Sequence, residues 1–449
     1  MRQRPKRVAT FTEESLGVSA SPARLQAAMI DWRSFSARRY RPFRLLAVAQ
    51  GFIGALSGPA IVIPLLLALG AHPALATALA VLPVLGSMVQ RFVPGILDRT
   101  DGNLRGIVIL GATIGEPRGL LLAGIVGLTA LGVLPSWAAI TLIAVVVGVL
   151  GSLGAVSYGM LQSWYQIILP DSERRVIGPR LGGIALGIGS VLLLPIAFTI
   201  NGLVSSIGLW AYAIPMTIAG IAGVMAPLAL RRIPSPGRIR VPRRATLTGP
   251  DEGRLRNLAH VLTLASLAGG LSPFLAVYAI AVLHTGPGFA IAISATSSAT
   301  LVGASLFVSS HLVRGSSSRL LRASMLLRGF ALLLGLAAHP SNPLAPLVLL
   351  AVAVMLAAGD TAGQLSANER LFRLATGPSV IAFQSHFVLR NTLAYTGGLL
   401  AGSAVMLLGG YLSFAILFGA AGAVRFTAAR TAHFSTAPRA ARAEVGATA

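Results

Sequence analysis

The 449-residue sequence has no cysteine and a single lysine, and only 13 of its residues are acidic. Without cysteine, the chain forms neither disulfides nor thiolate metal sites. Its one lysine, Lys6, lies in Pro-Lys-Arg, whereas a Walker A loop requires lysine in Gly-Lys-Ser/Thr. The first 21 residues also lack the apolar stretch of a secretory signal. We therefore expect no cofactor, no metal and no use of ATP.

Charged residues are scarce as well, at 11% of the chain, compared with about 25% in soluble proteins. Hydrophobic residues make up 55%, and the mean hydropathy is +0.78. The formal net charge of +23 would suggest nucleic acid in a soluble protein, but here it lies in short loops beside apolar stretches. Orientation in a bilayer and attraction to anionic lipid explain it better, so we expect a lipid bilayer and no nucleic-acid partner.

The sequence contains about twelve stretches long enough to cross a membrane, since a span needs roughly 20 apolar residues. They are residues 44–70, 73–97, 105–133, 136–168, 174–202, 206–230, 257–284, 288–313, 319–338, 343–366, 379–408 and 411–426. Most arginines fall in alternate connections between these stretches, while the other connections contain no Lys or Arg. Cytoplasmic loops carry the excess of Lys and Arg, so both termini are predicted to be cytoplasmic. The preference for arginine over lysine, with abundant Ala and Gly, is typical of bacterial chains and predicts the inner (cytoplasmic) membrane.

The long basic segment over residues 231–256 divides the spans six and six, and the two sets resemble each other. Pro59 and Pro73 are followed at an equal offset by Pro273 and Pro287 (273−59 = 287−73 = 214). We therefore predict a duplicated six-helix unit, which is how many secondary transporters are built. The predicted parts are an N-terminal arm (1–43) with an interfacial helix or a disordered segment, two bundles (44–230 and 257–428), the linker (231–256) and a disordered tail (429–449).

The loop after the second span carries a recognisable motif. Gly95, Asp98, Arg99, Gly102 and Arg105 lie in Gly-Ile-Leu-Asp-Arg-Thr-Asp-Gly-Asn-Leu-Arg, where acid and base can pair across a cytoplasmic helix junction and glycine permits a tight turn. This loop resembles the Gly-x-x-x-Asp-Arg-x-Gly-Arg-Lys motif of the major facilitator superfamily. Here the second glycine comes one residue late, and Asn-Leu replaces the basic pair.

The resemblance to the major facilitator superfamily extends to the whole layout of the chain. It implies an all-α integral membrane fold with about 12 transmembrane helices in two pseudo-symmetric six-helix bundles. In that family, spans one, four, seven and ten line the central cavity. Function would be secondary transport, in which the two bundles rock around a site near the middle of the membrane.

Two acidic residues, Glu116 and Asp360, fall well inside predicted spans, where ionisable groups usually face a cavity or a partner. Burial favours the neutral form of a carboxyl group and an arginine partner favours the charged form, so either group could carry a proton. The resemblance places Asp360 on a cavity-lining span, which makes it the better candidate for coupling. Glu116, in Glu-Pro-Arg, is expected to form a structural ion pair with a nearby arginine.

Further polar residues are candidates for substrate binding. Arg390 lies deep in span eleven, its repeat counterpart is Arg180 (390−180 = 210), and together they could bind an anion or serve gating. The other candidates are Gln50, Tyr158, Gln162, His386 and Asn391. Arg91 and Arg328 are expected to extend toward the inner surface instead.

The sequence thus predicts a transporter of a small organic solute, with a proton as candidate coupling ion and export favoured over import. One alternative is a transporter-like receptor or pseudotransporter, because the Asp98 loop departs from the family motif. The other is an integral-membrane enzyme. That class is disfavoured, because no pair of acids falls within the spans and there is no His-Glu-x-x-His run.

Overall fold

The computed structural model describes residues 38–80, 82–169, 171–238, 251–271, 273–312, 317–374 and 379–432. The chain divides into two units, Met1–Arg41 and Pro42–Ala449. In the first unit the structure describes a short 3-10 helix, η2 (Arg38–Tyr40). The interfacial helix predicted just before the first span lies outside the described residues, so the account below concerns the second unit.

The first half of this unit is a series of helices broken at several points by proline or glycine. Four of the six predicted spans are built from more than one helical segment. The segments are α3 (Arg41–Leu56), α4 (Pro59–Ala68), α5 (Pro73–Ala80), α6 (Leu82–Gly86), η3 (Ser87–Phe92), α7 (Val93–Arg99), α8 (Leu104–Gly115), α9 (Arg118–Ala130), α10 (Ser136–Val145), η4 (Val146–Leu150), α11 (Gly151–Ile168), α12 (Asp171–Ile207) and α13 (Trp210–Leu230).

The second half contains longer uninterrupted helices, and its first span is again broken. The segments are α14 (Asp251–Gly269), α15 (Phe274–Ala281), α16 (Pro287–Leu312), α17 (Ser317–Leu334), η5 (Gly335–Ala337), α18 (Ala345–Leu374), α19 (Ser379–Met406) and α20 (Gly410–Thr431). None of the described residues forms a β-strand.

Within the described residues, 10 helices are long and apolar enough to cross a membrane, or 11 when the bent pair 73–89 and 93–99 is counted as one span. The remaining predicted span corresponds to α19, a helix of 28 residues. The expectation of an all-α integral membrane fold is confirmed. The chain is a multi-pass membrane protein.

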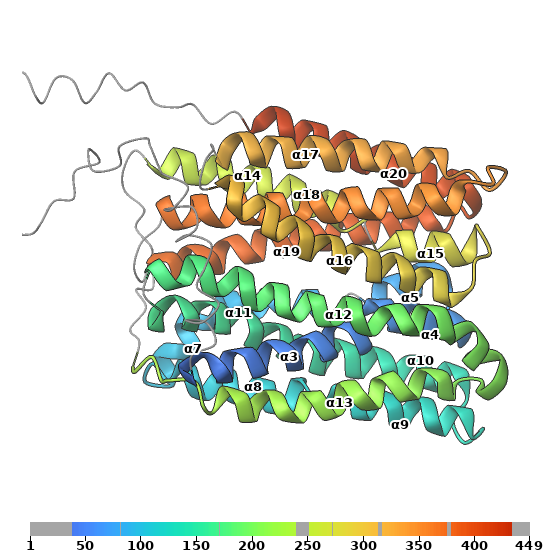
Figure 1. Ribbon diagram of the computed structural model, residues 1–449, viewed down its shortest axis with the longest axis horizontal. Coiled ribbons are helices and arrows are strands. Elements are labelled where there is room, and N and C mark those ends of the chain that lie inside the picture. Colours follow the sequence, from blue (N-terminus) through green and yellow to red (C-terminus); the bar gives the residue numbers. More distant parts are fainter. Residues whose placement is uncertain are drawn as a thin grey trace, which may run out of the picture. The chain divides into compact units, whose positions relative to one another are not determined.

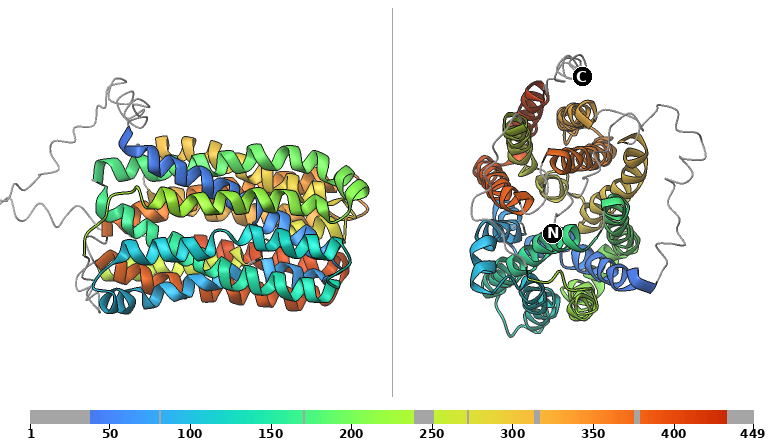
Figure 2. Two further views of the ribbon diagram at one scale, coloured as in Figure 1. Left: turned by 90° about the horizontal axis from the view of Figure 1, so that it is seen from below. Right: turned by 90° about the vertical axis from the view of Figure 1, so that its left-hand side faces the viewer.

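The long helices run side by side (Figure 1), and viewed end-on the blue-to-green and yellow-to-red helices mostly gather on opposite sides (Figure 2). Each half repeats the same packing: α9 lies against α13, and α17 lies against α20. Helices α12 and α16 join the two halves along their lengths, as α19 does with α5 and η3. Apolar side chains gain little by leaving lipid, so helices in a membrane associate through close packing. Small residues permit this close approach.

Several predicted span boundaries were wrong, as two examples show. Helix α14 begins at Asp251, six residues before the predicted span, so part of the supposed linker is helical. Helix α20 continues to Thr431, beyond the predicted end at 426 and into the predicted tail. In both cases, the prediction ended the helix where charged residues begin, although an α-helix readily continues past the apolar region of the bilayer.

Candidate functional site: a charged cavity between the halves

A cavity of about 520 Å³ lies where the two halves meet. Its walls are mostly small or apolar, with a few polar groups facing inward, a composition typical of small-molecule sites. Among the described residues, the polar and charged ones that line it are Ser57, Arg118, Ser294, Ser297, Asp360 and Tyr395. Within this set, the first half contributes a cationic side chain and the second half a carboxylate.

Both halves contribute a broken helix to the cavity wall. Pro59 is the first residue of α4, and Pro273 immediately precedes α15, so the two breaks occur at the offset that the sequence repeat predicts. Proline suits the start of a helix, where its missing N–H would have no intrahelical partner. Both prolines line the cavity. Non-helical backbone is tolerated inside a membrane where it borders such a space.

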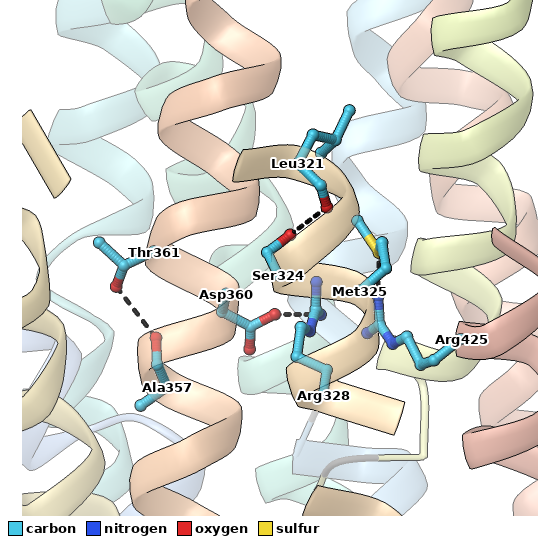
Figure 3. A network of polar contacts seen from close by, with 8 residues as sticks. All are labelled: Leu321, Ser324, Met325, Arg328, Ala357, Asp360, Thr361 and Arg425. Carbon is cyan, nitrogen blue, oxygen red and sulfur yellow. Dashed lines mark hydrogen bonds and ion pairs between the residues drawn. The ribbon is translucent and has the colours of Figure 1, made fainter. Parts of the chain in front are cut away.

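Asp360, on α18, forms an ion pair with Arg328 on α17 (Figure 3). The side chain of Asp360 is 35% exposed, whereas that of Arg328 is only 11% exposed. The expectation that Arg328 extends toward the membrane surface is therefore wrong. Its side chain lies between α17 and α18, where Gly359 and Gly363 leave room for it.

Arg425 is a buried cation near the end of the last predicted span, and it was not among the predicted site residues. On α20, this residue is 2% exposed, and its guanidinium lies 3.7 Å from the sulfur of Met325. Its Nε has no hydrogen-bond partner among the described residues. Helical periodicity in the sequence could have identified Arg425 as buried, because it continues the apolar face of α20 at steps of three or four residues. The preceding members of that face are Phe414, Leu417, Phe418, Ala421 and Gly422.

Arg118 pairs with Glu116 at a distance of 3.8 Å, across the junction between α8 and α9. Both side chains are mostly buried, with exposed fractions of 14% and 9% respectively. Gly154 of α11 packs against this pair, since a Cβ there would lie 3.1 Å from the Arg118 guanidinium. Arg118 also lines the cavity, whereas the sequence predicted only an ion pair between Glu116 and a nearby arginine. Arg118 precedes Arg328 by the repeat offset (328−118 = 210), which could have identified both.

Four of the seven candidate substrate residues have described side chains, and none of these four lines the cavity. Gln50 and Tyr158 lie with Glu116 beside a separate space of about 10 Å³ inside the first half, roughly the room of one water. Asn391 accepts a hydrogen bond from the Thr263 hydroxyl at 3.3 Å. Arg390 is exposed and does not line the cavity. The side chains of Gln162, Arg180 and His386 lie outside those described.

The loop between α7 and α8 makes a tight turn. Gly102 has φ 74°, and its N–H donates to the carbonyl of Leu97 at 2.7 Å. Asn103 caps α8 by accepting from the N–H of Gly106 at 2.9 Å. The guanidinium of Arg105 donates to the carbonyl of Arg231, at the end of α13. The turn therefore ties α8 to the last helix of its own half.

The remaining residues of this motif lie on α7. Asp98 and Arg99 occupy its last turn with exposed side chains, and a Cβ at Gly95 would meet no atom within 4 Å. Gly95 therefore serves no close packing in this structure. Arg91, on η3, is exposed.

No protein-family model matches the sequence, and neither does any curated protein sequence. Solved structures do match over most of the chain. The nucleoside transporter NupG aligns with a TM-score of 0.60 at 12% identity, over 89% of this chain and 100% of its own.

Two further transporters have similar structures. For the xylose transporter XylE from E. coli, the TM-score is 0.64 at 13% identity, with 87% of this chain and 97% of that chain covered. For the human organic anion transporter MFSD10, the TM-score is 0.57 at 14% identity, again with 87% of this chain and 97% of that chain covered. The chain therefore has the fold of major facilitator superfamily transporters.

Proposed function

We propose that this chain is a secondary active transporter of a small organic solute, working by alternating access. The observation that carries the proposal is the cavity of about 520 Å³ between the halves, walled by one broken helix from each. Its volume falls in the range of small-molecule sites, roughly 300–1,000 Å³. Rocking of one half against the other would open such a space to each side of the membrane in turn.

The Asp360–Arg328 pair supplies a means of proton coupling. A charged Asp360 is held by Arg328, whereas a protonated Asp360 has no net charge and releases it. Because Asp360 also lines the cavity, its protonation would be linked to substrate binding. The loop from Gly95 to Arg105 would serve gating, since it connects the cytoplasmic ends of α7 and α8.

The neighbouring structures are named as transporters of nucleosides, xylose and organic anions, which supports a small organic substrate. The basic loops support a cytoplasmic position for both termini, and the bacterial character of the composition supports the inner membrane. Export is favoured on general resemblance. The receptor or pseudotransporter is the second candidate, because the Asp98 loop lacks the basic pair of the family motif.

The test begins with thermal unfolding of the detergent-purified protein against nucleosides, sugars, organic anions and lipophilic drugs. A ligand at 100 times its dissociation constant stabilises by about 2.7 kcal/mol, which is readily measured. The ligand found is then supplied in radiolabelled form to proteoliposomes. Accumulation driven by a pH gradient or by counterflow supports transport. Binding without flux would overturn it and establish the receptor.

A further inference from the structure

The region around Arg425 contains more positive than negative charge. Two buried guanidinium groups, Arg328 and Arg425, accompany one carboxylate, Asp360, and that carboxylate is paired with Arg328. In Figure 3 the side chain of Arg425 reaches from α20 toward this pair, on the side away from Asp360. Among the described residues, no carboxylate lies within ion-pair distance of Arg425. Within the part of the chain that the structure describes, one positive charge thus lacks a counter-charge.

The groups that contact Arg425 compensate poorly for its burial. Met325 offers a thioether sulfur, which is a weak acceptor, and Nε has no partner among the described residues. A buried charge without compensation costs several kcal/mol. Removal of this cost requires a negatively charged group, which the neighbouring side chains do not provide.

A glycine lies between Arg425 and the wall of the cavity. Gly269, the last residue of α14, presents no side chain here, and a Cβ at this position would lie 3.6 Å from one guanidinium nitrogen. The same point lies 3.7 Å from the ring of Tyr395, which lines the cavity. Gly269 thus leaves room for about one small group in contact with both Arg425 and a residue of the cavity wall.

We propose that Arg425, with Arg328 behind it and Gly269 and Tyr395 beside it, binds a monovalent anion. A single negative charge would balance the charges of Arg328, Arg425 and Asp360, which sum to one positive charge. Guanidinium N–H groups bind halides and carboxylates with charge-assisted hydrogen bonds. The ligand is either an inorganic anion or a carboxylate on the transported solute. This proposal does not depend on transport. It places an anion site in the buried interior of the second half, whereas the sequence had suggested one at Arg390.

The test is thermal unfolding of the full-length protein in detergent, titrated with sodium chloride or sodium acetate at constant ionic strength, with sodium gluconate as the balancing salt. The wild type is expected to show a saturable rise in unfolding temperature. Arg425→Gln should raise the half-saturating concentration by about tenfold or more, since it removes a charge-assisted contact. Arg390→Gln, which changes an exposed arginine, should leave it within about twofold.

A second variant keeps the test decisive if Arg425→Gln does not fold. Asp360→Asn removes the competing carboxylate and should tighten anion binding. Stronger stabilisation by chloride would identify an inorganic anion, and stronger stabilisation by acetate a carboxylate. The proposal is overturned if the wild type shows no saturable rise, or if Arg425→Gln or Asp360→Asn responds as the wild type does. Because no flux is measured, failure here leaves the transport proposal untouched.

Discussion

Arg118 and Arg328 occupy equivalent positions in the two halves, 210 residues apart, yet each has a different partner. Arg118 pairs with Glu116 at the junction between α8 and α9, whereas Arg328 pairs with Asp360 on the neighbouring helix α18. Each arginine precedes a glycine, Gly119 or Gly329, that packs against the last helix of its half. The duplicated scaffold is thus retained, while the carboxylate in the second half is placed at the cavity.

Asp360→Asn is expected to abolish the dependence of transport on a pH gradient. Asparagine retains the size of the side chain but cannot exchange a proton, so substrate counterflow should continue while gradient-driven accumulation is lost. Flux in proteoliposomes with and without an imposed gradient measures this. Glu116→Gln is the matched control, because Glu116 does not line the cavity, and it should retain the dependence. Full retention in Asp360→Asn would remove Asp360 from proton coupling.

Gly119→Ala is expected to destabilise the protein by about 1–3 kcal/mol, because overpacking forces helices apart. A Cβ at Gly119 would lie 2.5 Å from backbone atoms of Met216 and Gly220 on α13. Gly124, on the same helix, provides the control, because a Cβ there would meet no atom within 4 Å. Gly124→Ala should be neutral or stabilise by up to about 1 kcal/mol through helix propensity. Equal unfolding temperatures of the two variants would contradict this packing.

The all-α fold was predictable from the sequence because a bilayer imposes a length and a composition on each span. The paired breaks at Pro59 and Pro273 were also predictable, since duplication preserves proline at a fixed offset. Apolar runs do not reveal which face of a helix points inward. Arg328 was therefore expected at the membrane surface and Arg425 was given no role, although both lie on buried helix faces.

The same limitation explains why Gln50 and Tyr158, predicted to bind substrate, do not line the cavity. Gln50 and Tyr158 were chosen as polar groups on spans expected to line the cavity, and both spans do contribute segments near it. Each side chain nevertheless lies beside a smaller space within the first half. A rotation of one residue, about 100°, separates the cavity face of a helix from a face packed within its own bundle.

Arg425→Met is expected to raise the unfolding temperature in buffer with gluconate as the only anion. Methionine has a comparable volume, and replacement of an uncompensated buried charge by an apolar group stabilises by about 1–4 kcal/mol. Arg328→Met should instead destabilise, since it leaves Asp360 without its partner. Thermal unfolding in detergent measures both. A lower unfolding temperature for Arg425→Met than for the wild type would mean that the charge of Arg425 is already compensated.

Ser297→Cys is expected to react with a water-soluble maleimide in the folded protein, because Ser297 lines the cavity. The chain has no cysteine of its own, so any labelling reports the introduced thiol. Ser413→Cys is the control, since Ser413 is 0% exposed and should react only after denaturation.

A ligand found by thermal unfolding should slow labelling at position 297 in proportion to its occupancy. Equal labelling rates at the two positions would show that the cavity is closed to water. Protection at 297 by a ligand that is not transported would favour the receptor over the transporter, because the cavity would then bind without alternating access.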